Sequence, residues 1–359
     1  MSPSLAICVV NYQGYDILPA TLAAVRGQLP PALDILLVDN ASTDGSVTYV
    51  REYFPDIRII ELETNRGPGL AREAGLLAAR TDLVGFVDND VAPDPDCFHL
   101  LSDALRVDES AALAMPRVVH SDQPGTVQFE GARAHFIGLM ALEGAEQPAG
   151  PAPAPRPISS IITACFLVDR RRWGDARLQD PNFFIYQEDH DLGLRAGQLG
   201  HGILSVPQAV CRHGKGTPGL SLRASDGYSS RRVMLTIANR WRILLTRYEL
   251  RTLLLLAPAL LIFEVMQLVG SILRGWFPSW TAAAAAIVRD LPTIMCERRD
   301  WAGQRRYGDG RVLEGGDLPF NPRLLRNRFE HVAGRVASAL GSLNWLLVRR
   351  LLRDSGARG

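Results

Sequence analysis

Two carboxylates, Asp88 and Asp90, follow the apolar run LVGFV of residues 83–87. In an extended segment, residues i and i+2 project to the same side, so both carboxylates would face one point and Asn89 would face away. Two hard oxygen ligands at one point suit Mg²⁺ or Mn²⁺, which keep further coordination sites for water and phosphate oxygens. An acidic turn that caps the following helix is the alternative for the same residues.

Asp39 lies directly after a second apolar run, DILLV. A carboxylate at the end of a strand could accept hydrogen bonds from a nucleobase imide or from a ribose. The residues from Ser42 to Ser46 that follow it are of the types that form turns and helix caps, and we assign them to that structural role.

The glycine-rich stretch NRGPG, residues 65–69, opens a further predicted helix. Its glycines would let the backbone approach a ligand, and a helix N-terminus favours an anion. Arg66 could therefore pair with a diphosphate. An ordinary Gly/Pro loop explains the stretch equally well, and since position 72 is Arg, the GxGxxG pattern of dinucleotide sites is missing.

The stretch NFFIYQEDHDLGLR, residues 182–195, places acidic residues directly after aromatic ones. A carboxylate beside apolar rings can have a raised pKa and act as a general base. A salt bridge with Arg195 at i, i+4 accounts for Asp191, and capping or pairing at the start of a helix accounts for Glu188. Asp189 is then the candidate general base.

His213 ends a strand-like run that begins at Val206, and glycine follows it. A lone histidine is most often structural or exposed to solvent. A neutral imidazole can, however, join two carboxylates on Mn²⁺, so His213 is a candidate third ligand beside Asp88 and Asp90.

Strands and helices must bring these residues together. Short apolar runs alternate with helical periodicity, the runs at residues 5–10, 34–38, 57–62 and 83–87 and the helices at residues 17–25, 47–54 and 70–79. The alternation predicts an α/β fold with a mostly parallel sheet covered by helices on both faces. Ligands of such open sheets bind at the carboxyl ends of the strands. We expect the residues that follow the strands to form one nucleotide-binding edge: Asn11, Asp39, Arg66 and Asp88.

The chain has 359 residues, of which 47% are hydrophobic and 21% charged, as in folded proteins larger than one average domain. Its net charge of +1 hides an asymmetry, because residues 1–221 contain 17 Lys and Arg against 27 Asp and Glu, and residues 222–359 contain 22 against 11. We predict two domains with this boundary, the second facing an anionic surface. The five cysteines form no CxxC pair, which argues against a disulfide framework or a zinc site and for a reducing compartment.

An apolar stretch at residues 253–273 is long enough to cross a bilayer. Pro258, Glu264 and Gln267 interrupt it, and a carboxylate near the bilayer centre is costly, so we expect an interfacial or core-packed helix. The arginines around it suit anionic headgroups, with a solvated basic face on a helical cap as the alternative. The sequence contains no RNA- or DNA-binding motif, and we expect no nucleic-acid partner.

Seven blocks of the sequence resemble, in order, the family 2 glycosyltransferases of the GT-A fold: VVNYQGYDILPATLAAV, LLVDNASTDGS, NRGPGLAREAG, GFVDND, TACFLVDRRRW, NFFIYQEDHDLGLR and PQAVCRH. They extend over about residues 4–215 and are closest to the rhamnosyltransferase-like branch, which builds bacterial surface polysaccharides. Many relatives in this branch have NPD where this chain has DND, which keeps both carboxylates. The Pro/Ala loop of residues 147–157 is not a family block and leaves the acceptor open.

The resemblance implies roles for the candidate nucleotide and metal residues. Asp39 contacts the nucleobase of a nucleotide-diphosphate sugar, and Arg66 lies near the same nucleotide. Asp88 and Asp90 bind the divalent metal, Mn²⁺ or Mg²⁺, that bridges the diphosphate. His213 matches a histidine that contacts metal or diphosphate in some members.

The resemblance further implies that Asp189 deprotonates an acceptor hydroxyl and that the anomeric centre inverts in a direct displacement. The expected reaction moves a sugar from a nucleotide-diphosphate sugar, such as dTDP-rhamnose, to a saccharide or lipid-linked acceptor in bacterial surface glycan synthesis. Residues 1–221 would form the catalytic GT-A domain, and residues 222–359 a helical region peripheral to the cytoplasmic, inner face of the cell membrane. A non-catalytic nucleotide-binding scaffold is one alternative. A sugar nucleotidyltransferase is the other, but it needs a glycine-rich basic loop after the first strand, where NYQGYD stands.

Overall fold

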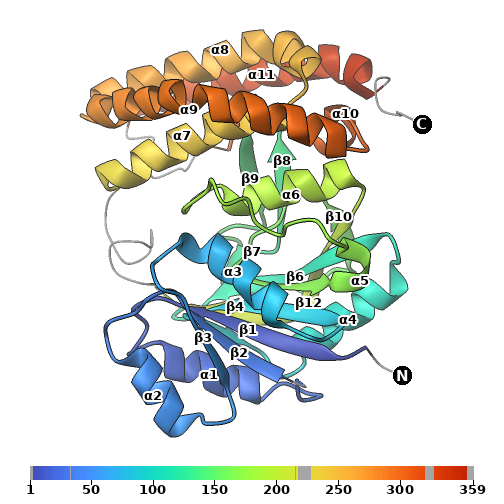
Figure 1. Cartoon of the computed structure of the whole chain (residues 1–359). Helices are drawn as coiled ribbons and strands as arrows, with labels where there is room; N and C mark the ends of the chain where they lie inside the picture. The colour runs from blue at the N-terminus through green and yellow to red at the C-terminus, as the bar shows by residue number, and fades with distance from the viewer. Residues whose placement is uncertain (1–2, 33, 215, 217–227, 320–326, 354–359) are drawn as a thin grey trace. The chain divides into compact units, whose positions relative to one another are not determined.

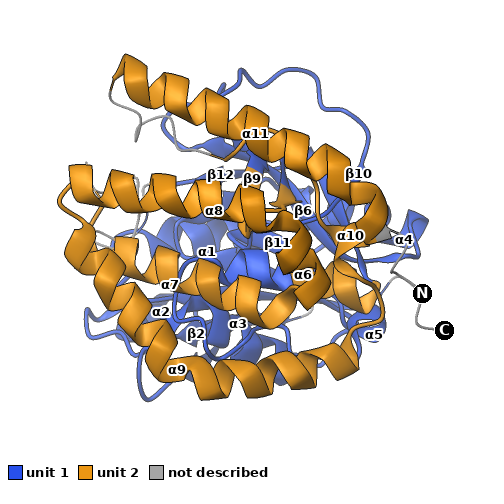
Figure 2. Ribbon diagram, turned by 90° about the horizontal axis from the view of Figure 1, so that it is seen from above, with its two compact units in different colours: residues 1–132, 142–192, 201–227 blue, residues 133–141, 193–200, 228–359 orange. Residues whose placement is uncertain are grey.

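The computed structural model describes residues 3–32, 34–214, 216, 228–319 and 327–353. The chain divides into two compact units (Figure 2). Unit 1 comprises residues 1–132, 142–192 and 201–227, and unit 2 comprises residues 133–141, 193–200 and 228–359. The domain boundary predicted after residue 221 falls within residues 217–227, outside the described residues.

Unit 1 is built on a sheet that the described residues form from ten strands. They are β1 (Leu5–Asn11), β2 (Asp34–Asp39), β3 (Arg58–Glu61), β4 (Leu83–Asp88), β5 (Val91–Pro93), β6 (Ala111–His120), β7 (Val127–Phe129), β10 (Arg156–Ile158), β11 (Cys165–Asp169) and β12 (Gly202–His213). The main path runs β10-β12-β6-β11-β4-β1-β2-β3. Two short strands, β8 (Gly131–His135) and β9 (Leu139–Glu143), pair with each other, and most of their residues belong to unit 2. Neighbouring strands from β4 to β3 are parallel, while β11 is antiparallel to β4 and β6. The mostly parallel sheet predicted from the sequence is confirmed.

Helices cover both faces of this sheet, as predicted. They are α1 (Leu18–Arg26), α2 (Ser46–Tyr53), α3 (Gly67–Ala78), α4 (Cys97–Val107) and α5 (Arg170–Trp173). A further helix, α6 (Glu188–Leu199), begins in unit 1, and its residues from 193 on belong to unit 2. α1 and α2 lie on one face and α3 on the other (Figure 1). Gly85 of β4 faces α4, where an added Cβ would lie 2.3 Å from the ring of Phe98, so this position accepts only glycine. Its neighbour Phe86 points to the opposite face and stacks on Phe166 of β11.

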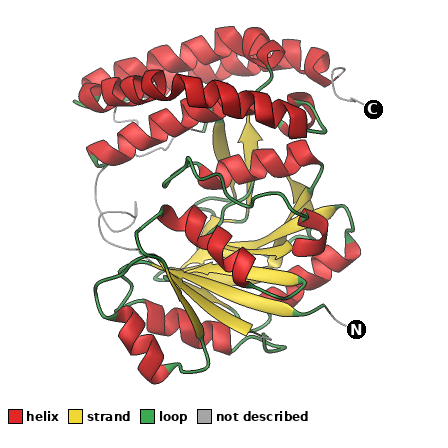
Figure 3. Ribbon diagram, viewed as in Figure 1, coloured by secondary structure: helices red, strands yellow, loops and turns green. Residues whose placement is uncertain are grey.

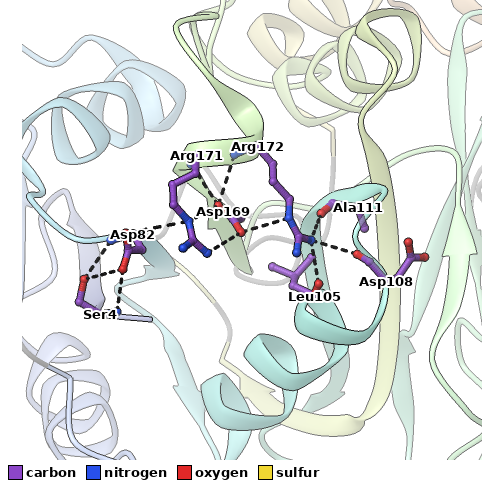
Figure 4. A network of polar contacts seen from close by, with 8 residues as sticks. All are labelled: Ser4, Asp82, Leu105, Asp108, Ala111, Asp169, Arg171 and Arg172. Atoms are coloured by element: carbon purple, nitrogen blue, oxygen red, sulfur yellow. Dashed lines mark hydrogen bonds and ion pairs between the residues drawn. The ribbon is translucent and has the colours of Figure 1, made fainter. Parts of the chain in front are cut away.

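Polar contacts fix the edge of the sheet where β1 and β4 begin (Figure 4). Asp82, just before β4, accepts hydrogen bonds from the backbone and the hydroxyl of Ser4, just before β1. Asp169 caps α5 and pairs with Arg172. The guanidinium of Arg172 also donates to three carbonyl groups that join the end of α4 to β6: Leu105, Asp108 and Ala111. The opposite edge, where β1, β2 and β4 end, is the one that holds the candidate site.

Unit 2 is mainly helical (Figure 3). Its helices are α7 (Ser230–Arg247), α8 (Leu250–Leu273), α9 (Phe277–Gln304), α10 (Asp309–Val312) and α11 (Arg328–Arg353). α7 and α9 share an apolar core of Val233, Ile237, Ala238 and Ala283, flanked by tryptophans. Among the described helices, α8 alone has the length and composition to cross a membrane, and only 17% of its most apolar window is buried. The helical C-terminal region predicted from the sequence is confirmed.

One local prediction was wrong. Asn89 and Asp90 form a turn between β4 and β5 and are not extended. Asp88 and Asp90 are therefore related by a turn and not by strand alternation.

Candidate functional site

Asn11, the last residue of β1, joins the ends of three parallel strands. Its Nδ2 atom donates to Asp39 Oδ1 at 2.8 Å and to the hydroxyl of Ser46 at 2.9 Å, and its Oδ1 atom accepts from Asn89 Nδ2 at 2.9 Å. The residue is completely buried. A buried amide with all its polar atoms bonded holds its neighbours in place. We therefore assign Asn11 a positioning role, and its direct contact with a nucleotide stays a prediction.

Asp39 fixes the turn that follows β2. Its Oδ2 atom accepts a hydrogen bond from the backbone of Ser42 at 2.8 Å, while Oδ1 is bonded to Asn11. Asp44 continues this turn, since its carboxylate accepts from the backbone of Tyr15 and from both donors of Ser46. The turn role predicted for Ser42 to Ser46 is confirmed, whereas the N-cap of α2 is Gly45 and makes no side-chain capping bond. Asp39 is only 2% exposed, and its contact with a nucleobase stays a prediction.

A cavity of about 440 Å³ opens beside these turns, lined by Gln13, Tyr15, Asp16, Ile17, Asp44 and Gly216. The Nε2 atom of Gln13 donates a 3.1 Å hydrogen bond to the hydroxyl of Thr43, in the turn that follows β2. The Tyr15 ring packs edge-on against Tyr49 of α2 at 5.7 Å. Its volume lies within the range of small-molecule sites.

Asp90 and His213 are brought together by the pairing of β5 with β12. The strands are antiparallel with Val91 opposite His213, and the backbone of Gly214 donates to the carbonyl of Asp90 at 2.7 Å. The Nε2 atom of His213 then lies 3.3 Å from Asp90 Oδ1, and its Nδ1 atom lies 2.7 Å from Gln128 Oε1. One ring nitrogen of His213 is hydrogen-bonded to a side-chain oxygen, and the other points toward a carboxylate. Many metal-ligating histidines are oriented in this way.

Asp88 belongs to the same electrostatic cluster. Burial raises the pKa of Asp88, with nearby Arg72 and His213 lowering it and Asp90 raising it further. Within the described ranges, however, no three His, Cys, Asp or Glu side chains are gathered closely enough to form a complete metal site. The donor set of two carboxylates and one imidazole nevertheless fits Mg²⁺ or Mn²⁺, which complete their coordination with water and phosphate oxygens.

Arg72 is a site residue that the sequence did not single out. It lies on α3, is 2% exposed, and its Nη2 atom is 2.5 Å from Asp88 Oδ1. Its positive charge also lowers the pKa values of Glu188 and Asp189. The sequence gives one indication that Arg72 is buried, namely its position on the apolar side of a helix. It follows Ala71 and lies one turn before Gly75 and Leu76, and these three residues are buried.

Glu188 and Asp189 begin α6 in a desolvated environment. Burial raises the pKa of Glu188 to about 8, and the charge of Asp189 raises it as well. Burial also raises the pKa of Asp189 to about 6, although a 2.8 Å hydrogen bond from the backbone of His190 opposes the rise. Both pKa values lie above the ordinary range of a carboxyl group, because the pair is desolvated and its two carboxyl groups interact. A carboxyl group with a raised pKa is a stronger base than an ordinary one, as suits a general base.

The backbone before Glu188 packs against the glycine-rich stretch. Gly67 has a φ of +84°, and a Cβ on it would lie 1.8 Å from the carbonyl oxygen of Phe184. Tyr186 and Gln187 both have positive φ values, 69° and 65°, which are costly for residues with side chains. Strain of this kind concentrates at functional sites, because surrounding structure must hold it in place.

Arg66 lies at the start of α3, beside Gly67. Its backbone N–H donates to Asn40 Oδ1 at 2.9 Å, and its side chain is exposed. Arg66 is thus tied to the end of β2 by its backbone, and its guanidinium is accessible to a ligand. Its pairing with a diphosphate stays a prediction.

Several known proteins are similar to this chain in sequence. Residues 4–150 match the family model "Glycosyl transferase family 2". The N-acetylglucosaminyl-diphospho-decaprenol L-rhamnosyltransferase of Mycobacterium tuberculosis is 27% identical over 239 residues, which are 60% of this chain and 77% of the relative. The dodecaprenyl-phosphate galacturonate synthase of Rhizobium johnstonii is 33% identical over 97 residues, 26% of this chain and 29% of the relative.

Two solved structures share the fold at low identity. GalNAc-T7, crystallised with UDP, GalNAc and Mn²⁺, has a TM-score of 0.53 and 16% identity, and the match covers 68% of this chain and 48% of that one. TarS of S. aureus has a TM-score of 0.51 and 14% identity, over 95% of this chain and 55% of that one. The chain thus spans about half the length of each, and the likeness establishes the GT-A fold.

Proposed function

Because the chain belongs to glycosyltransferase family 2, we propose that it transfers a sugar, with inversion, from a nucleotide-diphosphate sugar of the dTDP-rhamnose kind to a saccharide or lipid-linked acceptor. The observation that supports this most is one cluster at the ends of the parallel strands. In it the Asp88–Asp90–His213 group adjoins Arg72, which in turn is close enough to Asp189 to lower its pKa. The buried Arg72 thus pairs with Asp88 on the diphosphate side and acts electrostatically on Asp189 on the acceptor side.

The donor would lie along this strand edge. We place its base and ribose in the cavity beside Tyr15, next to Asp39, and its diphosphate toward Arg66 and the start of α3, where backbone N–H groups favour an anion. Asp88, Asp90 and His213 would hold a divalent cation, Mn²⁺ or Mg²⁺. When bound, such a cation stabilises the negative charge that develops on the leaving diphosphate.

Asp189 is the proposed general base. Its carboxylate would take the proton of the acceptor hydroxyl while the acceptor oxygen bonds to the anomeric carbon and the bond from that carbon to the diphosphate oxygen breaks. Attack from the face opposite the leaving group inverts the anomeric centre. Because burial brings the pKa of Asp189 to about 6, the group is both ionised and basic near neutral pH.

We further propose that the enzyme works at the inner face of the bacterial cell membrane, with residues 1–221 as the catalytic domain and residues 222–359 as the membrane-associated region. Support comes from the name of the M. tuberculosis relative, which specifies a decaprenol-linked acceptor. The excess of Lys and Arg in residues 222–359, 22 against 11 acidic residues, is consistent with an anionic surface.

A donor-hydrolysis screen tests the proposal. The purified chain is incubated with Mn²⁺ and each of a panel of nucleotide sugars, dTDP-rhamnose among them, and release of nucleoside diphosphate is measured. We expect one or a few donors to be cleaved, and cleavage to stop with EDTA and in Asp90→Ala. Binding of nucleotide sugars without turnover of any donor, with or without added acceptors, would make the chain a scaffold and overturn the proposal.

A further inference from the structure

α8 and α11 of unit 2 run side by side in opposite directions (Figure 2). Near one end, the Nδ2 atom of Asn344 on α11 donates to the carbonyl of Leu255 on α8 at 3.3 Å. At the other end, Arg274 directly after α8 pairs with Glu330 in the first turn of α11 at 2.7 Å. Contacts at both ends make the helices an antiparallel pair whose outward residues are neighbours.

α8 is apolar on the side that faces out. Exposed residues recur at intervals of three, four or seven along it, each between 48% and 67% exposed: Leu250, Leu254, Leu261, Val265, Val269 and Ile272. Its inward side packs through Leu256, Ala259 and Phe263, with Thr252 and Ser271 buried beside them. One apolar side turned to the core is what a surface helix of a soluble protein has, so the outward apolar residues of α8 are in excess of what packing requires.

α11 has a second outward apolar stripe, again at intervals of three and four residues: Phe329, Val332, Val336, Leu340, Leu343, Leu347 and Leu351. Phe329 is 87% exposed and Leu347 is 67% exposed. The other side of the helix is apolar as well and packs inward through Ala337, Trp345, Val348 and Leu352. One apolar side suffices for packing, so the outward stripe has no role within unit 2.

The charges around these stripes are of one sign. The acidic residues in the described parts of α8 and α11, Glu264 and Glu330, are each paired with an arginine. Arg328, Arg335 and Arg350 of α11 are exposed. By helical spacing they follow one flank of its apolar stripe. An apolar face bordered by arginines matches a surface of acyl chains and anionic headgroups.

The position of Glu264 indicates how α8 is oriented toward such a surface. It pairs with Arg240 of α7, which is completely buried, and accepts a hydrogen bond from the Nε1 atom of Trp241 at 3.0 Å. If α8 crossed the bilayer, this carboxylate and its arginine would lie in the hydrocarbon layer, which is costly. A helix lying in the plane of the interface leaves the pair within the protein.

We propose that the outward stripes of α8 and α11, together the α8–α11 face, dock on a bilayer that contains anionic lipids, with both helices parallel to the membrane plane. The inference deepens the membrane placement proposed above and rests on that part of it alone. It needs no donor, acceptor or metal. Its failure would therefore leave the transfer reaction untouched.

Vesicle flotation with the purified full-length chain tests this proposal. Vesicles of phosphatidylcholine alone are compared with vesicles in which about half of the lipid is phosphatidylglycerol. We expect binding to the anionic vesicles, reduced at least about tenfold by Leu340→Glu with Leu347→Glu. Arg335→Gln and Arg350→Gln should each weaken it roughly fivefold. Val107→Glu, at a residue that is 79% exposed on α4 of unit 1, is the matched control and should bind like the wild type.

Three results would overturn the proposal. One is equal binding by the wild type and the Leu340→Glu, Leu347→Glu variant, provided circular dichroism and urea denaturation show that the variant is folded. A second is a dimer in sedimentation velocity that the same substitutions convert to a monomer, since the face would then join two copies of the chain. The third is a chain that alkaline carbonate fails to extract from cell membranes, which would mean that α8 crosses the bilayer.

Discussion

Arg72 and Asp88 form a buried ion pair at 2.5 Å that joins α3 to the end of β4. The Arg72 side chain is 2% exposed, whereas that of Asp88 is 28% exposed and faces the site. Arg72 thereby opposes the effect of burial on three carboxyl groups, since its charge lowers the pKa values of Asp88, Glu188 and Asp189. The pair connects the diphosphate side of the proposed site to its general-base side.

Arg72→Met should both destabilise the fold and impair the reaction. Removing one member of a buried ion pair leaves the other charge uncompensated, so we expect the free energy of unfolding to fall by about 3 kcal/mol in urea denaturation. Without the cation, the pKa of Asp189 should rise, and the pH at which activity reaches half its maximum should rise with it. Arg51→Met, in an exposed ion pair with Glu61, is the control and should change stability by less than about 1 kcal/mol. Unchanged stability in Arg72→Met would contradict this reading of the pair.

Asp189→Asn should lower kcat by about 10² to 10⁴ and leave the Kd for the donor nucleotide unchanged, because the amide cannot accept the acceptor proton. In the wild type, activity should rise with pH through about 6, since the ionised form of Asp189 is the active one. Single-turnover rates across pH and isothermal titration with the donor measure the two quantities. Asp175→Asn, at an exposed position, is the control. A kcat that Asp189→Asn leaves within threefold of the wild type would remove Asp189 from the role of base.

Glu188→Gln should remove a pH-dependent term from stability. In the folded chain the pKa of Glu188 is about 8, whereas an unfolded glutamate has a pKa of about 4.3. The folded state therefore binds this proton more tightly, and its contribution to stability is complete below about pH 4 and is lost as the pH rises through 8. Thermal unfolding between pH 5 and 9 should show a shallower decline in Tm for Glu188→Gln than for the wild type. Parallel Tm curves would mean that Glu188 is not protonated in the folded chain.

Most of the parallel half of the sheet was predictable from the sequence, because its strands are short continuous apolar runs and each ends in a polar residue. Asn11, Asp39 and Asp88 could thus be placed at one edge. The region after residue 111 was not predictable in the same way. β11 runs antiparallel between β4 and β6, and apolar runs give no direction to a strand that is buried on both faces.

The site itself was predictable only where its residues follow strands. The contact of His213 with Asp90 depends on the register of β5 against β12, which pairs segments more than a hundred residues apart and is not encoded in either alone. The pairing of Arg72 with Asp88 depends on which side of α3 meets the sheet. Both contacts arise from packing between distant segments, so a resemblance in sequence motifs can imply the residues but not their geometry.

Asp90→Asn should raise the Mn²⁺ concentration needed for half-maximal donor hydrolysis at least about tenfold, because an amide is a weaker ligand than a carboxylate. His213→Gln should also raise this Mn²⁺ concentration, but by a smaller factor, because Asp88 and Asp90 would remain as ligands. Titration of Mn²⁺ into EDTA-treated protein measures the effect. His99→Gln, at a half-exposed position on α4 near Asp103, is the control. An Mn²⁺ requirement that neither Asp90→Asn nor His213→Gln alters would place the metal elsewhere.

Gly67→Ala tests whether the glycine-rich stretch supports the general base. A Cβ at Gly67 would have a φ of +84° and would lie 1.8 Å from the carbonyl of Phe184, four residues before Glu188. Gly275→Ala is the matched control, because Gly275 has a φ of +71° but nothing within 4 Å of an added Cβ. Gly275→Ala should lose roughly 1 kcal/mol of stability to the backbone strain, and Gly67→Ala should lose more, because the clash with Phe184 adds to that strain.

Only Gly67→Ala must also displace residues 184–188, so it alone should lower kcat, and its pH–rate profile should shift as the burial of Asp189 changes. Donor-hydrolysis rates across pH, measured beside urea denaturation of both variants, separate the two effects. Equal kcat values for Gly67→Ala and Gly275→Ala would mean that the packing of Gly67 on Phe184 shapes the fold and not the catalytic base.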